Sequence, residues 1–387
     1  MEIFNSFNPF SFPMFSKRVT SIELSGIRKI FDMAHGEVIN LGLGEPDFQP
    51  PPEALEAIKE AVKMGYNKYG PSKGFPELRE ALAEKFSKYA DITADNVLVT
   101  VGATEGMLAT LLSTINPGDE VLYPDPGFVL YKPHTIIAGG RPVAYPIKQE
   151  NDFMPTQEDL EEKISDKTKA IILNYPNNPT GGVIDEKHIR MIVDLAEDND
   201  LLIISDEVYF NIIYESKPQT FLGRYDKLIF VNSFSKEFAM TGWRLGYLIA
   251  PKEYVDQIGK IHYYSVACPQ SPIEYAALVA LKNSGYYANM MVEKFKRRRD
   301  LIYELLSKMD GVNPNFPKGA FYIFPRIELD ADPMDIVRKV VEKGVLCTPG
   351  EAFGESGKKH IRFSYAASEE NIIKGMEIFD SVLDEFR

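Results

Sequence analysis

Short apolar runs alternate with amphipathic helical patterns from about residue 40 to residue 280, and this alternation constrains the fold more than any other feature. Each run is rich in Val, Ile and Leu and is bounded by Pro, Gly, Asn or Asp, which is typical of buried strands. Alternating strands and helices predict an α/β fold, in which a mostly parallel sheet carries helices on both faces. The runs predict a seven-stranded sheet, with strands at Val97–Val101, Val121–Tyr123, Val143–Tyr145, Ala170–Leu173, Leu201–Ser205, Leu228–Val231 and Gly246–Ala250.

The last hundred residues show a different pattern. A long helical stretch precedes strands expected at Ala320–Phe324 and His360–Ser364, and Ser368 is expected to cap a final helix. We predict a large domain of residues 45–281 and a smaller α/β domain of residues 1–44 and 282–387. Aromatic residues near the N-terminus predict an arm that docks on its own domain or on a second subunit; they are Phe4, Phe7, Phe10, Phe12 and Phe15.

Charge and composition argue against several classes of protein. The chain has 43 Lys and Arg against 56 Asp and Glu, a net charge of −13, and an acidic chain repels nucleic-acid phosphates. The basic run from Lys294 to Asp300 is interleaved with acidic residues, which predicts a solvated helix face rather than a nucleic-acid site. No run of about eighteen apolar residues exists, so we expect no membrane-spanning helix.

The cysteines indicate a reducing compartment, and the histidines bear on whether a metal is bound. Cys268 and Cys347 are the two cysteines, and neither lies in a C-x-x-C motif. We therefore expect a cytoplasmic protein without a disulfide framework or a zinc site. The five histidines have no metal-ligand spacing, so we assign no metal.

Four of the predicted strands are followed by residues that can carry chemistry. Taken singly, each of these residues is more common as a turn, a helix cap or a solvated surface residue. Ligands of such sheets bind beyond the carboxyl ends of the strands, so we expect these residues to share one rim. Together they predict a site that binds an anion and keeps a lysine for covalent chemistry. They are Gly102 to Glu105 at a helix start, Asn174 and Asn178, Asp206, and Ser233 with Lys236.

Five motifs in order resemble those of the class I aminotransferases, which have fold type I and use pyridoxal phosphate. The motifs are GEPDF, NxxNPTG, SDEVY, FSKEFAMTGWRLG and KGAFYIFPR, and the resemblance extends from about Ser25 to the C-terminus. Within this family the chain most resembles the archaeal aromatic and aspartate enzymes. The resemblance implies transfer of an amino group between an L-amino acid and a 2-oxo acid.

The resemblance also assigns roles around the cofactor ring. Lys236 is implied to form the Schiff base with the cofactor aldehyde and then to move a proton from the substrate Cα. Asp206 is implied to face the pyridine nitrogen and keep it protonated. Tyr209 and Asn178 would donate hydrogen bonds to the phenolate oxygen of the ring. Phe128 falls where the family stacks an aromatic side chain on the ring, although many relatives have Trp there.

The phosphate and the second subunit have their own implied residues. Arg244, eight residues after the lysine as in the family, would pair with phosphate oxygens. Ser233 would add a hydroxyl, and Ala103 and Thr104 would add backbone N–H groups at a helix start. Tyr69 matches a tyrosine that reaches the phosphate of the partner subunit. The resemblance therefore implies a homodimer with shared active sites.

For the substrate, the resemblance implies that Arg362 binds the α-carboxylate, with Gly44 and Asn178 beside it. Because Arg362 lies in the predicted small domain and Lys236 in the large one, substrate binding is expected to draw the domains together.

The resemblance says less about which substrate side chain the site accepts than about the α-carboxylate. Thr104 stands where some aspartate-specific relatives have a lysine. Other relatives lend an arginine across the dimer from a loop similar to residues 261–270, where this chain has Tyr263 and Tyr264. These replacements predict an aromatic or broad substrate range and leave aspartate open.

Two other functions are alternatives. The same cofactor supports C–S β-elimination, cyclopropane-carboxylate synthesis and decarboxylation. A cofactor-sensing regulator would need an N-terminal DNA-binding domain, and the roughly 25 residues before the first family-like segment are too few for one.

Overall fold

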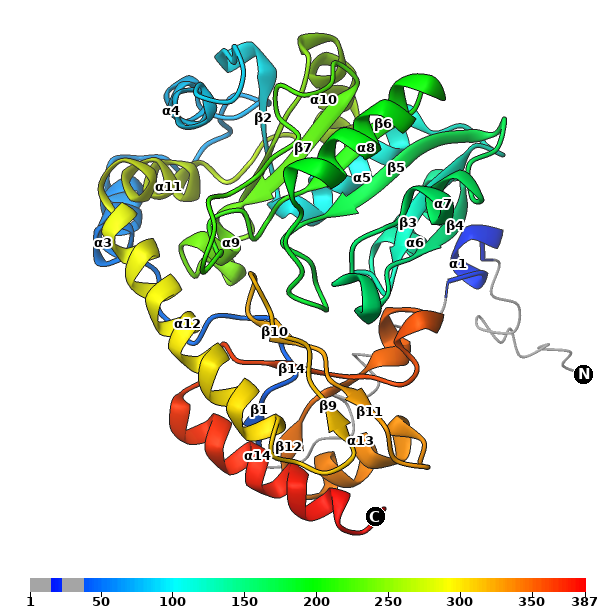
Figure 1. Cartoon of the computed structure of the whole chain (residues 1–387). Helices are drawn as coiled ribbons and strands as arrows, with labels where there is room; N and C mark the ends of the chain where they lie inside the picture. Colours follow the sequence, from blue (N-terminus) through cyan, green and yellow to red (C-terminus); the bar gives the residue numbers. More distant parts are fainter. Residues whose placement is uncertain (1–14, 23–37) are drawn as a thin grey trace, which may run out of the picture.

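The computed structural model describes residues 15–22 and 38–387. Its largest sheet has seven strands in the order β2-β8-β7-β6-β5-β3-β4 (Figure 1). Strand β8 is antiparallel to β2 and β7, and the other neighbouring strands are parallel, so the predicted mostly parallel sheet is confirmed. Each predicted run overlaps one strand: β2 (Val97–Thr100), β3 (Glu120–Asp125), β4 (Arg141–Pro146), β5 (Thr168–Asn174), β6 (Leu202–Asp206), β7 (Leu228–Ser233) and β8 (Gly246–Ile249).

Helices cover both faces of this sheet because its strands bury side chains on both sides. In β2, Val97 and Val99 belong to one hydrophobic core, and Leu98 belongs to a second core on the opposite face. The first core contains residues of α4 (Pro76–Phe86), α7 (Gln157–Glu161), α8 (Glu186–Asp198) and α11 (Ser271–Asn283). The second core contains residues of α5 (Gly102–Thr114), α6 (Tyr131–Ala138) and α10 (Lys252–Val266). Helix α3 (Pro52–Lys63) packs on α11.

The predicted smaller α/β unit lies below the large sheet in Figure 1. Short strands form three small sheets: β1 (Ile39–Asn40) with β12 (Val345–Leu346), β10 (Tyr322–Ile323) with β14 (Ile361–Ser364) and β13 (Thr348–Pro349), and β9 (Val312–Asn313) with β11 (Arg326–Ile327). Three helices pack on them: α12 (Gly285–Leu306), α13 (Pro333–Glu342) and α14 (Glu369–Leu383). Ser368 caps α14 as predicted, because its side chain accepts a hydrogen bond from the N–H of Asn371.

Part of the predicted N-terminal arm lies outside the described residues, including Phe4, Phe7, Phe10 and Phe12. Phe15 is described and is exposed, just before the short helix α1 (Lys17–Thr20). Within residues 15–22 and 38–387, no helix is both long and apolar enough to cross a membrane.

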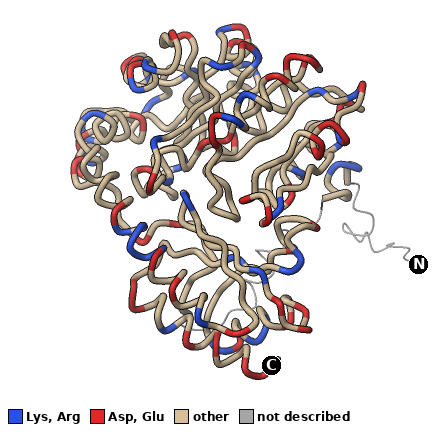
Figure 2. The backbone as a smooth tube through the Cα atoms, in the orientation of Figure 1, with Lys and Arg blue, Asp and Glu red and all other residues tan. Residues whose placement is uncertain are grey.

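Acidic and basic residues are interspersed along the backbone in both halves of the molecule (Figure 2). The prediction of a solvated face for the basic run on α12 was wrong for two of its arginines. Arg298 is 7% exposed and Arg299 is 1% exposed. Arg298 forms two hydrogen bonds with Asp47, and Arg299 bonds with Glu215, Asp300 and the carbonyl of Pro317. The acidic partners of these two arginines are distant in sequence apart from Asp300, so the charge pattern of the helix did not reveal them.

Candidate active site

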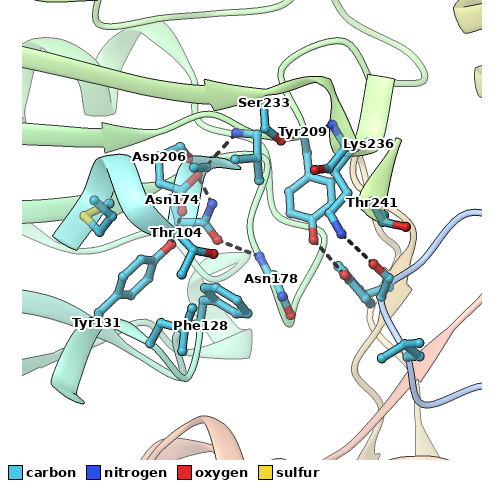
Figure 3. Close-up of a pocket in the computed structure, with 18 of the residues that line it drawn as sticks. Thr104, Phe128, Tyr131, Asn174, Asn178, Asp206, Tyr209, Ser233, Lys236 and Thr241 are labelled. Atoms are coloured by element: carbon cyan, nitrogen blue, oxygen red, sulfur yellow. Dashed lines mark hydrogen bonds between the residues drawn. The ribbon is translucent and has the colours of Figure 1, made fainter. Parts of the chain in front are cut away.

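A pocket lies at the carboxyl ends of β5, β6 and β7, where residues of the smaller unit close it from the other side. Figure 3 shows Tyr131, Asn174 and Asp206 on one side of this pocket, with Tyr209 and Lys236 on the other. Every predicted site residue except Tyr69 lines it: Gly44, Ala103, Thr104, Phe128, Asn178, Asp206, Tyr209, Ser233, Lys236, Arg244 and Arg362. Tyr69 is 89% exposed and does not line this pocket.

Lys236 lies in the short helix α9 (Phe234–Glu237), which Ser233 begins by accepting a hydrogen bond from the N–H of Ser235. Its Nζ donates a 2.6 Å hydrogen bond to the carbonyl of Gly44. Burial lowers the pKa of Lys236 to about 8; nearby Glu45 opposes this shift, whereas Arg244 and Arg362 add to it. An amine with this pKa is partly unprotonated near neutral pH, as a nucleophile or base requires.

Asp206 is the last residue of β6 and is 6% exposed. Tyr131 donates a 2.8 Å hydrogen bond to its Oδ2, and the N–H of Val208 donates one of 3.3 Å to its Oδ1. Burial raises the pKa of Asp206 to about 6, while these two hydrogen bonds and the charge of Lys236 act in the opposite direction. A buried carboxylate of this kind favours a cationic partner in the pocket.

Arg362 is 2% exposed and lies on β14. Its Nη1 donates a 2.9 Å hydrogen bond to Oδ1 of Asn178, and its Nη2 donates to the carbonyl of Gly42. The guanidinium carbon lies 4.5 Å from the ring centre of Tyr322 and 4.7 Å from that of Phe353. In the described part of the chain no carboxylate forms an ion pair with Arg362, and its buried Nε has no hydrogen-bond partner.

The guanidinium of Arg244 lies beside Gly102, at the N-terminus of α5. Gly102 has φ +76°, which strains any other residue, and a Cβ at this position would lie 2.5 Å from Nη2 of Arg244 and displace that guanidinium. No side chain caps α5, a helix of thirteen residues, so its first N–H groups, which include those of Ala103 and Thr104, remain available to a ligand. Both the helix dipole and Arg244 favour an anion here.

A protein-family model described as "Aminotransferase class I and II" matches residues 36–378. The chain belongs to this family. A probable aspartate aminotransferase of Methanocaldococcus jannaschii is 43% identical over 379 residues, which are 96% of this chain and 100% of the relative. The aromatic-amino-acid aminotransferase 2 of Thermococcus litoralis is 41% identical over 96% of this chain and 98% of that protein. The structure of an alanine aminotransferase from Pyrococcus furiosus matches with TM-score 0.92 and 36% identity, covering 96% of this chain and 100% of the other.

The aminotransferase pocket also contains residues that the sequence analysis did not single out. Tyr131 is the first residue of α6, three positions after Phe128, and nothing in its motif marked it as a partner of Asp206. Tyr322, inside the KGAFYIFPR motif, has its hydroxyl 2.6 Å from that of Tyr209. His134 is 6% exposed, and burial lowers its pKa to about 4, so the imidazole is neutral at neutral pH.

Asn174 was predicted at the rim, and its role is to join neighbouring strand ends. Its Nδ2 donates a 2.9 Å hydrogen bond to the carbonyl of Asp206, and its Oδ1 accepts one of 2.9 Å from the N–H of Asn178. Because Oδ1 of Asn178 is occupied by Arg362, its Nδ2 is the group left to donate to a ligand.

The segment expected as a loop at residues 261–270 is in part helical, because α10 continues to Val266. Tyr263 and Tyr264 lie in its last turn, are 52% and 86% exposed, and do not line the pocket of their own chain. No group of three or more His, Cys, Asp or Glu side chains within the described ranges is arranged to hold a metal ion.

Proposed function

We propose that this aminotransferase binds pyridoxal phosphate in the pocket, attached to Lys236, and that Arg362 binds the substrate's α-carboxylate. The observation that carries the proposal is the setting of Arg362. A guanidinium that is 2% exposed and has only neutral partners is unfavourable by itself, so the site favours an anionic ligand. Planar guanidinium groups bind carboxylates through two parallel hydrogen bonds, which the free Nε permits.

The phosphate end of the cofactor fits the turn before α5. Arg244 lies against Gly102, and a side chain at residue 102 would fill the space beside the guanidinium. The uncapped helix start supplies the N–H groups of Ala103 and Thr104, and Ser233 lines the same pocket. Cation, dipole and donors together suit a doubly charged phosphate.

The cofactor ring has its own proposed partners. Asp206 would hold the pyridine nitrogen protonated, because a buried carboxylate with a raised pKa gains by pairing with a cation. Asn178 and Tyr209 would donate to the phenolate oxygen, and Phe128 would cover a face of the ring. When bound, pyridoxal phosphate supplies an aldehyde that exchanges amino groups and a cationic ring that accepts electrons.

Lys236 would then act as the base that moves a proton at the substrate Cα. Its pKa of about 8 leaves a fraction of the amine unprotonated at neutral pH, and the carbonyl of Gly44 orients the nitrogen. Gly44 lies beside the proposed carboxylate site and would place backbone groups next to the substrate.

The pocket lining supports an aromatic or otherwise apolar substrate side chain. The cations of the lining are Lys236, Arg244 and Arg362, and all three already have proposed ligands. The remaining lining residues include the apolar side chains Leu43, Met107, Leu130 and Val208. A substrate carboxylate among these groups would lack a partner, whereas a ring would bury apolar surface.

We also propose a cytoplasmic homodimer with shared active sites. The 89% exposed side chain of Tyr69 supports this, since it is free to reach the phosphate of a partner subunit. Separate hydrophobic cores on the large sheet and in the smaller unit support the proposed boundaries, with a large domain at 45–281 and a small domain at 1–44 and 282–387. In that arrangement Arg362 and Lys236 belong to different domains, and substrate binding would draw them together.

The full-length protein, loaded with pyridoxal phosphate and reduced with borohydride, tests the attachment. Peptide mapping should place the cofactor on Lys236, and Lys236→Ala should give no labelled peptide, whereas the surface variant Lys252→Ala should label normally. A label on another lysine would contradict the proposal. The products decide between activities, because transamination gives a 2-oxo acid with the substrate side chain intact, whereas C–S β-elimination of a cysteine conjugate gives pyruvate, ammonium and a thiol.

Arg362→Lys tests the carboxylate site. Lysine keeps the charge and cannot form the two-pronged pair, so kcat/KM should fall for all amino acids by a similar factor, on the order of tenfold or more. A loss confined to one class of substrate would mean that Arg362 contacts the side chain instead.

A further inference from the structure

Residues 40–49, here called the crossing segment, begin at the last residue of β1 and lead toward α3, and they contact both proposed catalytic cations. The carbonyl of Gly42 accepts a hydrogen bond from Arg362, and the carbonyl of Gly44 accepts one of 2.6 Å from Nζ of Lys236. Two carbonyls in one short stretch of chain therefore orient the residue that would bind the substrate and the residue that would move its proton. A loop with this task must itself be held in place.

The start of the crossing segment is held by its own side chain. Oδ1 of Asn40 accepts hydrogen bonds from the N–H groups of Gly42, at 3.1 Å, and Leu43, at 3.0 Å. This fixes the turn that presents the carbonyl of Gly42 to Arg362. Beyond Leu43 the chain belongs to no helix or strand until α3 begins at Pro52, so contacts with other elements must hold it.

The far end of the segment is held by α12. Arg298 donates two hydrogen bonds to Asp47, of 2.7 Å to Oδ1 and 2.8 Å to Oδ2. Its guanidinium carbon lies 5.1 Å from the ring centre of Phe48, and that ring meets Phe295 edge-on at 5.5 Å. The hydroxyl of Tyr287 adds a 2.7 Å hydrogen bond to the carbonyl of Gln49.

The pair between Arg298 and Asp47 is more than a surface ion pair. The Arg298 side chain is 9% exposed and that of Asp47 is 32% exposed, and the contact is two-pronged. Such charge-assisted pairs fix both distance and orientation. Removal of Asp47 would leave a buried guanidinium without an anion, so the segment has a strong preference for this position.

Helix α12 extends from the large sheet's side to the smaller unit, where it lies along α14 (Figure 1). Three successive arginines on it have different surroundings. Arg297 is exposed, Arg298 holds the crossing segment, and Arg299 bonds with Glu215 and the carbonyl of Pro317. The helix therefore offers a matched control one residue away from the anchoring arginine.

We propose that Arg298 is a positioning residue of the aminotransferase, acting through Asp47 to fix the crossing segment so that Gly42 and Gly44 keep Arg362 and Lys236 in place. This inference rests on the roles proposed above for those two cations. Arg298, in the basic run of α12, would thus affect substrate binding and proton transfer indirectly, without contacting substrate or cofactor.

The test compares Arg298→Gln and Asp47→Asn with Arg297→Gln in the full-length, cofactor-loaded protein. Both anchor variants should raise KM for phenylalanine and lower kcat, each by about tenfold, because small displacements of reacting groups have effects of this size. Calorimetry with 3-phenylpropanoate, a carboxylate that cannot react, should show a similar loss of affinity. Arg297→Gln should match the wild type in all three measurements.

A purely structural role predicts a different result. It would lower the melting temperature of both anchor variants and leave KM, kcat and 3-phenylpropanoate affinity within about twofold of the wild type, and this would overturn the inference. If Arg298→Gln does not fold, Asp47→Asn decides the matter, because it keeps the side-chain volume at a partly exposed position. A wild-type protein that bound neither pyridoxal phosphate nor 3-phenylpropanoate would overturn both the inference and the proposed function.

Discussion

The hydroxyl of Tyr131 donates a 2.8 Å hydrogen bond to Oδ2 of Asp206, and both side chains are buried. The two residues come from different elements, since Tyr131 begins α6 and Asp206 ends β6. The hydrogen bond stabilises the ionised form of a carboxyl group whose pKa burial raises to about 6. In the proposed function, Tyr131 would therefore help to set the pH at which Asp206 can pair with the cationic ring of the cofactor.

Tyr131→Phe should move the acidic limb of the kcat/KM profile to higher pH. Loss of the hydroxyl removes a contact that lowers the Asp206 pKa, so this pKa rises and more of the enzyme is protonated at pH 6. We expect about a sevenfold loss of kcat/KM at pH 6, because a hydrogen bond to a charged group contributes about 1.5 kcal/mol or about one pKa unit, and a smaller loss at pH 8. Tyr254→Phe on α10 is the control, and an equal loss at both pH values would contradict the prediction.

Phenylalanine or tyrosine should exceed aspartate in kcat/KM by about tenfold or more. The apolar lining favours a ring, and an aspartate side chain would enter as an unpaired carboxylate. Single-turnover reduction of the cofactor across a panel of amino acids measures this preference directly. If aspartate proves better by tenfold, a basic residue outside the lining of this pocket must reach the substrate.

Gly44→Ala should disable the site without unfolding the protein. A Cβ at residue 44 would lie 1.9 Å from the hydroxyl oxygen of Tyr322, so this side chain must move. Its 2.6 Å hydrogen bond with Tyr209 and its contact with Arg362 would be lost, and we expect kcat/KM to fall by about a hundredfold. The control is Gly242→Ala, because a Cβ there meets no atom within 4 Å. Similar kinetics for the two variants would refute the steric argument.

Glu207→Gln should flatten the pH dependence of stability between pH 6 and pH 9. Glu207 is 1% exposed, and burial raises its pKa to about 8, whereas the unfolded chain has the ordinary value of about 4.5. The folded state thus keeps a proton that the unfolded state releases, and the free energy of unfolding falls as pH rises through this window. Urea unfolding at pH 6 and pH 9 measures the difference, on the order of a few kcal/mol for the wild type.

A residual slope is expected in Glu207→Gln, because burial also raises the pKa of Glu274 to about 7 and that of Asp206 to about 6. A variant whose stability falls as steeply as that of the wild type would show that Glu207 is already ionised in the folded protein.

The sequence predicted the strands and the shared rim because both follow from short-range patterns. Apolar runs bounded by turn residues identify buried strands, and parallel strands bring their carboxyl ends together, so Asp206 and Lys236 could be expected at one edge. The partners of these residues could not be expected in the same way. Tyr131 reaches Asp206 across 75 positions, and Arg298 reaches Asp47 across 251.

The charge pattern of α12 also led to a wrong prediction, because it indicated solvent exposure for Arg298 and Arg299, which are buried. Three arginines in succession look alike in sequence, yet helical geometry turns one to solvent and two toward acidic groups contributed by other segments. The exposed position of Tyr263 and Tyr264 at the end of α10 could not be predicted either, because the residue that caps the end of the helix, Ala267, has φ +66°, and no glycine marks that position in the sequence.

As the proposed carboxylate site, the buried guanidinium of Arg362 would make the thermal stability of the enzyme depend on the supply of its substrates. A carboxylate that binds only the folded enzyme raises its stability by an amount that grows with the logarithm of ligand concentration. The same contact also relieves a cation that otherwise has neutral neighbours alone. The enzyme should therefore resist unfolding best when amino and 2-oxo acids are abundant, and should become easier to degrade when both run short.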